Sequence, residues 1–559
     1  MKNLIIRADA GGVLGTGHIM RMIALAQAYM RRGGNVVIAS AQCPSAVVDR
    51  VKELGIRHQL LDGCILGDAQ DADLTLELCK ELGARWMVLD GYHLDETYQK
   101  RVSGHGIKVL AIDDYGHCAT WHCDAVLNQN LGSENWQRGN SSQPDMQWLL
   151  GSSFALIREE FLVSIQRAKE KSFPAQRILV TMGGADVDNV TLTILKSLEH
   201  TNLDTLDIRV LAGGANAHQK ELQQWAQKSR HQVEILTNVR DMPSMYEWTD
   251  AVISAGGSTC WEWLAYGLAG AVVTIAENQE PIVEELKKRE LALTLGWPTD
   301  RAVTVWKRLL DRWISSGLEG IAYQQKHTVI DGKGADRVAS LLSDRLIITI
   351  ATAATGWLRN SVDKLKEKLE GLGHQVHVVF DAQEIPPSDI LFLLSFWSLI
   401  PANILTNNTH NIVIHGSDLP KGRGWSPVTW QIIDGENKIP MTLFEATEKV
   451  DAGDVYLKSM MVFLGDELLD EIQEKQALAQ FDLCCDFVEH YPSIVTNKQA
   501  QIGDSFTYPR RSSKDSMLDV NKTIHEQFNI LRTVDNDNYP AYFEMAGRTY
   551  TIKIEGSER

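Results

Sequence analysis

Two histidines stand where the chain changes from a strand-like run to a glycine-containing turn. His18 ends the segment GTGH of residues 15–18, which separates the apolar run LIIRA from an amphipathic stretch that extends to about Arg31. His415 ends the apolar run NIVIH and opens the segment HGSDLPKGRG. Histidine gains and loses a proton near neutral pH. Both segments therefore predict proton transfer to or from a bound substrate.

The first of these turns has the features of an anion site. Gly15 and Gly17 allow the backbone to approach a ligand closely, and the start of the following helix offers unpaired N–H groups to a negative charge. His18 would lie in the first turn of that helix. An isolated GTGH segment also has a plainer interpretation, in which His18 is a surface histidine beside a flexible turn.

A second anion site is predicted in the segment AVISAGGSTCWEWLAYGLAGAVVTIAENQ, residues 251–279. It repeats the order of strand, glycine-containing turn and helix, and it ends at the close of another strand. A carboxylate one turn inside the helix suits hydrogen bonds to ribose hydroxyls, although such a residue alone is more often an ordinary surface group. The candidate binding residues of this segment are Gly256, Gly257, Ser258, Thr259, Glu262, Asn278 and Gln279.

The stretches around these motifs alternate between buried strands and helices. Parallel strands are predicted at LIIRA, NVVIAS, WMVLD, KVLAID and AVLN, and the pattern restarts at Arg177 with ILVTM, DIRVLA, VEILT, AVISA and AVVTI. Such alternation predicts two doubly wound α/β lobes whose ligands bind outside the carboxyl ends of the strands. A third α/β unit begins at LIITIA, and short β-like runs follow about Tyr508.

We therefore predict an α/β chain with four parts. The two lobes take residues 1–155 and 156–340, the third unit takes 346–505, and a small β-rich segment takes 506–559. The polar stretch at 331–344 is expected to hold the last helix of the second lobe and a short linker.

The composition of the chain limits which partners and which cellular location are expected. A formal charge of −17 over 559 residues is poor material for a nucleic-acid surface, which needs Lys and Arg at the phosphates. No apolar run reaches the roughly 18–20 residues of a membrane span, and acidic Asp9 comes too early for a secretion signal. Eight scattered cysteines form no disulfide framework, so we expect a cytoplasmic protein. The His and Cys residues at 117–123 have no zinc-like spacing, and no metal is expected.

The first part of the chain, to about residue 330, resembles the UDP-sugar hydrolases of pseudaminic acid biosynthesis, which are related to the two-lobed GT-B glycosyltransferases. The resemblance is carried by RADAGG, GTGHIMR, LDGYHLD, IDDYGHCATWHCDAVLNQN, SFALIREEF, ILVTMGGADVDN and SAGGSTCWE with ENQ. It implies two Rossmann-like lobes in a GT-B arrangement. It also implies that His18 assists the attack of water on the anomeric carbon, with Asp9 as a weaker candidate. The turn at 256–259 would hold the diphosphate and Glu262 the ribose.

The later part of the chain resembles the folate-dependent formyltransferases. DILFLLSFWSLIPANIL, GRGWSPVTW and PMTLFEATEKVDAGDVY carry this resemblance. It implies a Rossmann-like catalytic domain, 10-formyltetrahydrofolate as formyl donor, and His415 and Asp451 as the residues that manage protons. The family has an Asn two residues before the His, where this chain has Val413. The candidate replacements are Asn411, about 7 Å further along the same strand face, Ser417 and a backbone N–H.

The second resemblance also implies binding residues. SFWSLIP matches the segment that cradles the pterin, and a basic loop follows that suits the folate tail. The cofactor-binding residues are then Phe396, Trp397, Ser398, Leu399, Arg423 and Gly424. Asp418 either pairs with an amine on the sugar or caps a turn. The tail resembles that of sugar formyltransferases, and its arginines either contact a diphosphate or pair with surface carboxylates: Arg510, Arg511 and Arg532.

Together the two resemblances predict a bifunctional enzyme. The second half would formylate the 4-amino group of a UDP-2-acetamido-4-amino-2,4,6-trideoxyhexose of the altrose series, and the first half would hydrolyse UDP from the product. Two alternatives stay open: a true glycosyltransferase in the first half, and a non-catalytic folate- or sugar-binding module in the second. A homodimer through the formyltransferase half is a further expectation.

Overall fold

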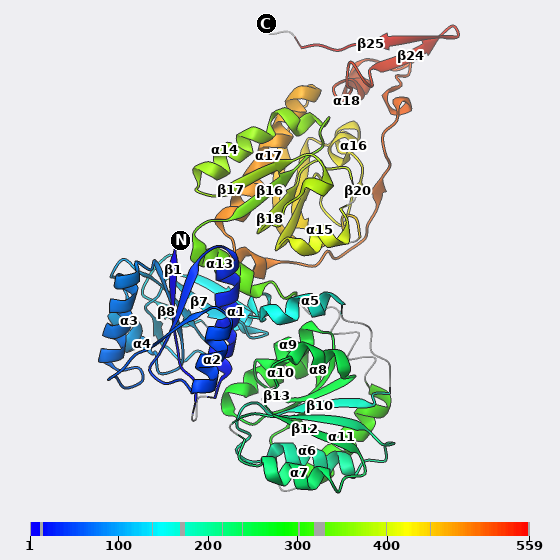
Figure 1. The fold of residues 1–559 in the computed structure, drawn as a ribbon. Helices are drawn as coiled ribbons and strands as arrows, with labels where there is room; N and C mark the ends of the chain where they lie inside the picture. The colour runs from blue at the N-terminus through cyan, green and yellow to red at the C-terminus, as the bar shows by residue number, and fades with distance from the viewer. Residues whose placement is uncertain are drawn as a thin grey trace. The chain divides into compact units, whose positions relative to one another are not determined.

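The chain folds into two compact units, Met1–Ser343 and Asp344–Arg559. The computed structural model describes residues 2–11, 15–136, 138–167, 174–214, 216–237, 239–299, 302–317, 330–398, 400–447 and 449–556. In each unit, helices flank a mainly parallel sheet (Figure 1).

The first lobe of the first unit is built on a parallel seven-stranded sheet with strand order β3-β2-β1-β4-β5-β7-β9. Its central strands are buried on both faces, which is why they read as continuous apolar runs in the sequence. The strands are β1 Asn3–Ala8, β2 Asn35–Ser40, β3 Arg57–Leu60, β4 Trp86–Asp90, β5 Lys108–Ile112, β7 Ala125–Asn128 and β9 Gln147–Leu150. β6 Thr120–Trp121 and β8 Asn140–Ser141 form a separate pair. The helices are α1 Gly17–Arg31, α2 Ser45–Glu53, α3 Ala69–Leu82 and α4 Glu96–Val102, and the next helix, α5 Glu159–Arg167, contacts helices of both lobes.

The second lobe repeats this construction with a parallel six-stranded sheet of order β12-β11-β10-β13-β14-β15. Its strands are β10 Arg177–Thr181, β11 Asp207–Ala212, β12 Gln232–Thr237, β13 Ala251–Ala255, β14 Ala269–Val273 and β15 Ala292–Gly296. Its helices are α6 Val190–Glu199, α7 Gln219–Ala226, α8 Met242–Trp248, α9 Thr259–Ala265, α10 Glu280–Lys288 and α11 Ala302–Arg312. In both lobes the glycine-containing turns follow the carboxyl ends of strands.

The last helix of the first unit, α13 Gly334–Ser343, departs from the expectation for residues 331–344. It packs against α1 of the first lobe rather than on the second lobe (Figure 1). Arg31 of α1 pairs with Asp336 at 2.7 Å, and Arg337 donates to the carbonyl of Ser153 at 2.7 Å. The apolar side of α13, with Val338 and Leu342 buried, is covered in this way.

The second unit has a six-stranded sheet of order β17-β16-β18-β19-β21-β22, in which the first four are parallel and the last two antiparallel. Its strands are β16 Ile347–Ala351, β17 Gln375–Val379, β18 Ile390–Leu393, β19 His410–His415, β21 Lys438–Glu445 and β22 Val455–Val462. Its helices are α14 Val362–Gly371, α15 Ala402–Asn407, α16 Pro427–Ile433, α17 Leu469–Glu489 and α18 Phe528–Leu531. The short strands β20 Arg423–Gly424 and β23 Thr507–Tyr508 pair, and β24 Ala541–Met545 and β25 Arg548–Ile552 form a hairpin.

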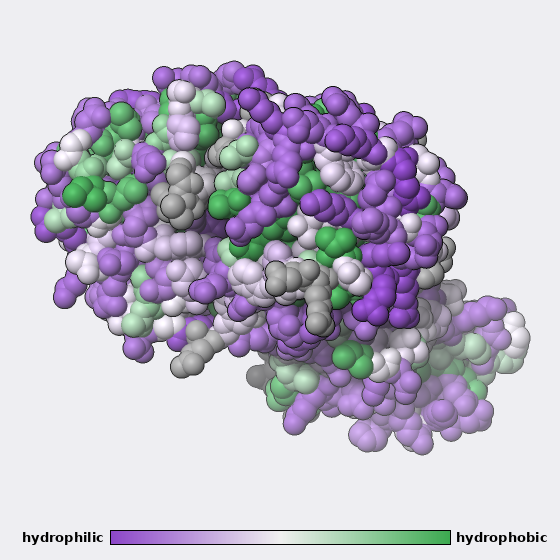
Figure 2. All heavy atoms as spheres, turned by 90° about the horizontal axis from the view of Figure 1, so that it is seen from below, coloured by the Kyte–Doolittle hydropathy of each residue, from purple (hydrophilic) through white to green (hydrophobic). Residues whose placement is uncertain are grey.

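The predicted α/β fold class is confirmed, because each unit is organised around parallel sheets with helices between the strands. The four predicted domain ranges stay predictions. The face drawn in Figure 2 is mostly hydrophilic, and its apolar side chains lie in small scattered groups. Among the described residues, none of the helices is both long and apolar enough for a membrane crossing. All eight cysteines are free thiols.

Candidate active sites

A cavity of about 230 Å³ in the first unit collects predicted residues from both lobes. Gly17 and His18 reach it from the start of α1, and Gly257 and Ser258 reach it from the turn between β13 and α9. The remaining lining residues are Arg21, Tyr92, Asp114, Gln129, Asn130, Asn278, Gln279 and Ile282. The fold explains this convergence, since all these segments follow the carboxyl ends of parallel strands.

His18 is held by a carboxylate at the end of β4. Its Nδ1 lies 2.7 Å from Oδ1 of Asp90, a fully buried side chain. The ionised carboxylate can only accept, so Nδ1 carries the ring proton and Nε2 is the atom that can accept another. The His18 side chain is 11% exposed, so the ring is ordered and still reachable from the cavity.

A buried charge network surrounds this pair. Arg21, one turn after His18 in α1, donates to Asp90 and Asp114, with its shortest contacts at 2.6 and 2.7 Å. Burial alone would raise the pKa of Asp90, but the charge of Arg21 outweighs it and holds that pKa well below its usual value. Burial also works against the ionised form of Asp114, and Arg21 again lowers the pKa. Both carboxylates therefore stay ionised beside the cavity.

Tyr92 connects this network to the second lobe. Its hydroxyl donates to Asp114 at 2.8 Å and accepts from the amide of Asn278 at 3.2 Å. Burial raises the pKa of Tyr92, and the charge of Asp114 adds to the rise, so the hydroxyl keeps its proton. The ring of Tyr92 also meets that of His18 edge to face, with centroids 5.1 Å apart.

The other residues predicted for this site do not line the cavity: Asp9, Gly15, Gly256, Thr259 and Glu262. The carboxylate of Glu262 accepts from Arg158 at 3.1 Å and from the Tyr246 hydroxyl at 3.2 Å. Gly256 is a packing position, because a Cβ there would lie 2.5 Å from a methyl of Val283.

Asp9 is buried in a network of its own at the end of β1. It accepts from Arg7 at 2.5 Å, from His93 at 2.8 Å and from the backbone N–H groups of Ala41 and Gln42. Burial works against its ionised form, but the partners lower the pKa of Asp9. These contacts join the ends of β1 and β2.

Sequence reasoning missed the charged and hydroxyl-bearing partners at this site, Arg21, Asp90, Tyr92 and Asp114, and also the lining residues Gln129, Asn130 and Ile282. A signal was present, because LDGY and IDDY each place a carboxylate directly after a buried strand, in the same way as the recognised turns. The partner of each carboxylate could not be read from these segments, since Arg21 is 69 residues from Asp90 and 93 from Asp114.

The second unit places His415 at the end of β19, facing Asp451. His415 Nε2 lies 2.9 Å from the carbonyl of Gly422, and a carbonyl only accepts, so Nε2 is protonated. Nδ1 faces Oδ1 of Asp451 at 3.9 Å. The other carboxylate oxygen of Asp451 accepts from the backbone N–H of Gly424 at 2.9 Å. Both side chains are close to nine-tenths buried.

The candidate side-chain replacements for the family's Asn lie in β19 and just after it, and their surroundings differ. Val413 packs among apolar neighbours that include Phe396 and Leu419. The amide of Asn411 donates to the carbonyl of Leu405 at 2.9 Å, near the end of α15. Ser417 is buried, and its hydroxyl has no hydrogen-bond partner within the described residues. The role of each of these residues stays a prediction.

The predicted folate segment follows β18 in an exposed turn. Phe396 packs against the apolar cluster of β18, whereas Trp397, 57% exposed, and Ser398 point to solvent; Leu399 lies outside the described residues. Arg423 donates to Gln501 at 2.7 Å, and its buried Nε lacks a described partner. An exposed aromatic ring suits a flat pterin, and an incompletely satisfied guanidinium suits an anionic tail. Gly424, at φ +93°, is required by the chain itself, because a Cβ would lie 2.5 Å from the carbonyl oxygen of Tyr508.

The other charged candidates of the second unit are engaged within the chain. Asp418 forms an exposed ion pair with Lys458. Arg510 lies over the ring of Trp425, 5.0 Å from its centroid, and Arg511 donates to the carbonyl of Thr533 at 3.2 Å. The Arg532 side chain is fully buried and donates to Asn437 at 2.7 Å, which indicates a structural role.

Two family models match the chain. Residues 372–483 match the formyl transferase family, and residues 177–295 match the C-terminal domain of glycosyltransferase family 28. The second unit thus contains a formyl transferase domain, and the second lobe of the first unit is a domain of the glycosyltransferase type. Formyl transferases use 10-formyltetrahydrofolate as donor, and this is the cofactor that the sequence predicts. No group of three or more His, Cys, Asp or Glu placed to hold a metal ion occurs in the described part of the chain.

Individual proteins match over parts of the chain. Methionyl-tRNA formyltransferase of Lactococcus lactis is 32% identical over 139 residues, 25% of this chain and 44% of that protein. The enzyme of Mycoplasma capricolum is 27% identical over 171 residues, 30% and 52% respectively. The chain thus spans about half the length of the curated relatives it matches.

Solved structures match in the same two regions. A 4-N formyltransferase from Francisella tularensis is 17% identical with TM-score 0.31, covering 38% of this chain and 99% of that one. MurG of Acinetobacter baumannii is 15% identical with TM-score 0.43, covering 61% and 99%.

Proposed function

We propose that the first unit hydrolyses a UDP-sugar at its anomeric carbon. The observation that carries this proposal is the His18–Asp90 pair, which opens onto the same cavity as the Gly257–Ser258 turn. A base and an anion-binding turn at one cavity suit the cleavage of a bond between a sugar and a diphosphate.

The chain's own groups are arranged for this reaction. Asp90 holds the ring so that Nε2 of His18 can take a proton from water. The water oxygen bonds to the anomeric carbon, the bond from that carbon to the phosphate oxygen breaks, and UDP leaves with the electron pair. Gly257 and Ser258 hold the leaving diphosphate. Asn278 and Tyr92 orient the sugar at the junction of the lobes.

We propose that the second unit transfers a formyl group to the 4-amino group of a UDP-2-acetamido-4-amino-2,4,6-trideoxyhexose. The bound 10-formyltetrahydrofolate would supply the formyl group, held by Phe396, Trp397, Ser398 and Arg423. The amine nitrogen would bond to the formyl carbon as the bond from that carbon to the folate nitrogen breaks. His415 would accept the proton that the attacking amine loses, through Nδ1, and a proton would return to the folate nitrogen. Asp451 would stabilise the charged ring. Formylation precedes the loss of UDP, because the formylated UDP-sugar is the preferred substrate of the first unit.

Specific observations favour two further candidates. The family 28 match of residues 177–295 favours a glycosyltransferase in the first unit, with a sugar acceptor in place of water. Val413, among apolar neighbours where relatives carry a hydrogen-bond donor, favours a second unit that binds without catalysing. If the first unit is a hydrolase, water receives the sugar, and if it is a glycosyltransferase, an acceptor molecule does. If the second unit is a catalyst, the mass of the sugar increases by one formyl unit, and if it only binds, that mass does not change.

The test is mass spectrometry of the sugar, with UDP measured in parallel. The full chain is incubated with the UDP-amino-sugar, with and without 10-formyltetrahydrofolate, in the absence of an acceptor. We expect one added formyl unit with the folate and release of UDP in both cases. UDP release that requires an added acceptor would establish the transferase, and an unchanged sugar mass would establish a non-catalytic second unit.

A further inference from the structure

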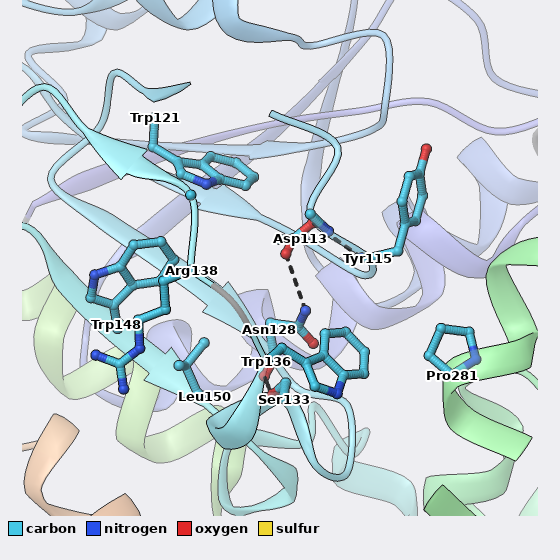
Figure 3. Close-up of a pocket in the computed structure, with 12 residues that line it drawn as sticks. Asp113, Tyr115, Trp121, Asn128, Ser133, Trp136, Arg138, Trp148, Leu150 and Pro281 are labelled. Atoms are coloured by element: carbon cyan, nitrogen blue, oxygen red, sulfur yellow. Dashed lines mark hydrogen bonds between the residues drawn. The ribbon is translucent and has the colours of Figure 1, made fainter. Parts of the chain in front are cut away.

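A second cavity of about 300 Å³ is lined mainly by the first lobe, with Pro281 from α10 of the second lobe, and none of its lining residues was predicted from the sequence. Figure 3 shows Trp121, Trp136 and Trp148 around it, with Asp113 and Asn128 among the indole rings and Arg138 beside Trp148. Trp121 is buried at 1% exposure, so it forms a fixed wall. Asn128 donates to Asp113 at 3.1 Å, and the guanidinium of Arg138 lies 5.8 Å from the ring centroid of Trp148.

This tryptophan cavity adjoins the cavity of His18. Asp113 and Asp114 are consecutive, yet the first lines the tryptophan cavity and the second lines the His18 cavity. In α10, Pro281 lines the tryptophan cavity and the next residue, Ile282, lines the His18 cavity. The wall between the cavities is aromatic, since Tyr92 lies 5.0 Å from Tyr115 between ring centroids.

The order of groups along this wall follows the order of parts in a UDP-sugar. Gly257 and Ser258 are placed for the diphosphate, and His18 is placed for the anomeric carbon. Tyr92 follows His18 on the side of the tryptophan cavity, at 5.1 Å between ring centroids. Small-molecule sites usually measure about 300–1,000 Å³, so the 230 Å³ of the His18 cavity is small for a whole nucleotide sugar. The two cavities together reach the usual range.

The lining of the tryptophan cavity fits an acylated amino-sugar. Indole rings present flat apolar surface, which suits the C–H faces of a pyranose, a 6-methyl group and the methyl of an acetamido group. The carboxylate of Asp113 can accept from hydroxyl or amide N–H groups, and Arg138 can donate to an acyl carbonyl. A diphosphate fits poorly, because the ionised carboxylate of Asp113 repels a negative charge.

We infer that the tryptophan cavity binds the hexose of the UDP-sugar, with its acylamino groups, and sets the specificity of the first unit for that sugar. This inference rests on the function proposed for the first unit. It assigns the nucleotide to the His18 cavity and the sugar substituents to the three tryptophans.

The test separates sugar binding from nucleotide binding in the full chain. Release of UDP from the formylated UDP-sugar gives the KM for the whole substrate, and inhibition by UDP alone gives an inhibition constant for the nucleotide. Both values report on the first unit, because only that unit releases UDP. The variants are Trp136→Leu and Trp148→Leu, which alter half-buried walls. Trp225→Leu is the matched control, a half-buried tryptophan that packs on the core of the second lobe.

We expect each cavity variant to raise the KM about tenfold, since a large apolar contact with the sugar is lost, and to leave the inhibition constant for UDP unchanged. The control should change neither value. An unchanged KM in both cavity variants would overturn the inference while UDP release by the unaltered protein upholds the proposed function. A rise in the inhibition constant for UDP that parallels the rise in KM would also overturn the inference. An unaltered protein that releases no UDP would remove the proposed function together with the inference.

Discussion

At the scale of single residues, the proposed chemistry of the first unit depends on Asp90, which accepts hydrogen bonds from two side chains. One carboxylate at the end of β4 accepts from His18 at 2.7 Å and from Arg21 at 2.6 Å. Arg21 is the cationic partner of both buried carboxylates, Asp90 and Asp114, so its loss would leave two buried negative charges uncompensated. The role that we propose for Asp90 is to fix the tautomer of His18.

The Asp90→Asn variant tests this task. An amide can donate to Nδ1 and so favour the tautomer that places the proton on Nε2, which disables the base. We expect kcat for UDP release to fall by about 100-fold or more, with a much smaller change in KM. Steady-state release of UDP measures both. The control is Asp73→Asn, an exposed carboxylate of the same lobe that pairs with Arg101; equal losses in the two variants would contradict the assignment.

In the second unit, we expect Val413 to limit the rate of formyl transfer. It lies on the same strand face as His415, and its side chain is partly exposed. One well-placed donor to a developing oxyanion is worth about 10²–10³ in rate. We expect Val413→Asn to raise the rate of formyl transfer by at least about tenfold, measured by mass spectrometry of the sugar. Val462→Asn, on the exposed face of β22, is the control. An unchanged rate in Val413→Asn would mean that another group already serves as donor.

At the scale of elements, the turn between β13 and α9 performs two tasks with adjacent glycines. Gly256 lets α10 approach the turn, because a Cβ there would lie 2.5 Å from Val283. Gly257 faces open space, with nothing within 4 Å of an added Cβ, and it lines the His18 cavity. One glycine thus serves helix packing, and its neighbour leaves room for a ligand.

The paired variants Gly256→Ala and Gly257→Ala should separate these tasks. Gly256→Ala forces α10 outward and should cost about 1–3 kcal/mol of the free energy of unfolding, measured by urea denaturation. Gly257→Ala should leave that free energy nearly unchanged and raise the inhibition constant for UDP. If Gly256→Ala were as stable as the unaltered protein, the packing account of this turn would be wrong.

At the scale of the whole molecule, each unit has its own sheets and its own candidate base. His18 and its partners come from residues within Met1–Ser343, and His415 and Asp451 come from residues within Asp344–Arg559. Neither proposed reaction needs a side chain from the other unit. The two activities should therefore be separable.

Complementation tests this separation. The His18→Asn chain should accumulate formylated UDP-sugar, and the His415→Asn chain should release unformylated sugar only. Mixing the two variants should restore the formylated free sugar, because the intermediate can diffuse between molecules. Mass spectrometry of the sugars follows all three species. A mixture that makes no formylated free sugar would show that the intermediate must pass within one chain.

The sequence by itself determined the strands, the glycine turns and the two histidines. Buried parallel strands have continuous apolar sequences, and a turn that approaches a ligand closely needs glycine. Both features depend on the local sequence, so they can be predicted from it. Gly17, His18, Gly257, Ser258, Asn278 and Gln279 were predicted in this way, and they line one cavity.

Only the tertiary structure decided the partners of these groups. Asp90 meets His18, which is 72 residues away, and α13 packs against α1 rather than on the second lobe. The tryptophan cavity likewise joins segments that share no sequence pattern. Hydrogen bonds and packing between distant segments depend on strand order and on which helix face remains uncovered. Neither the strand order nor the uncovered helix face can be predicted from the residues on either side of a motif.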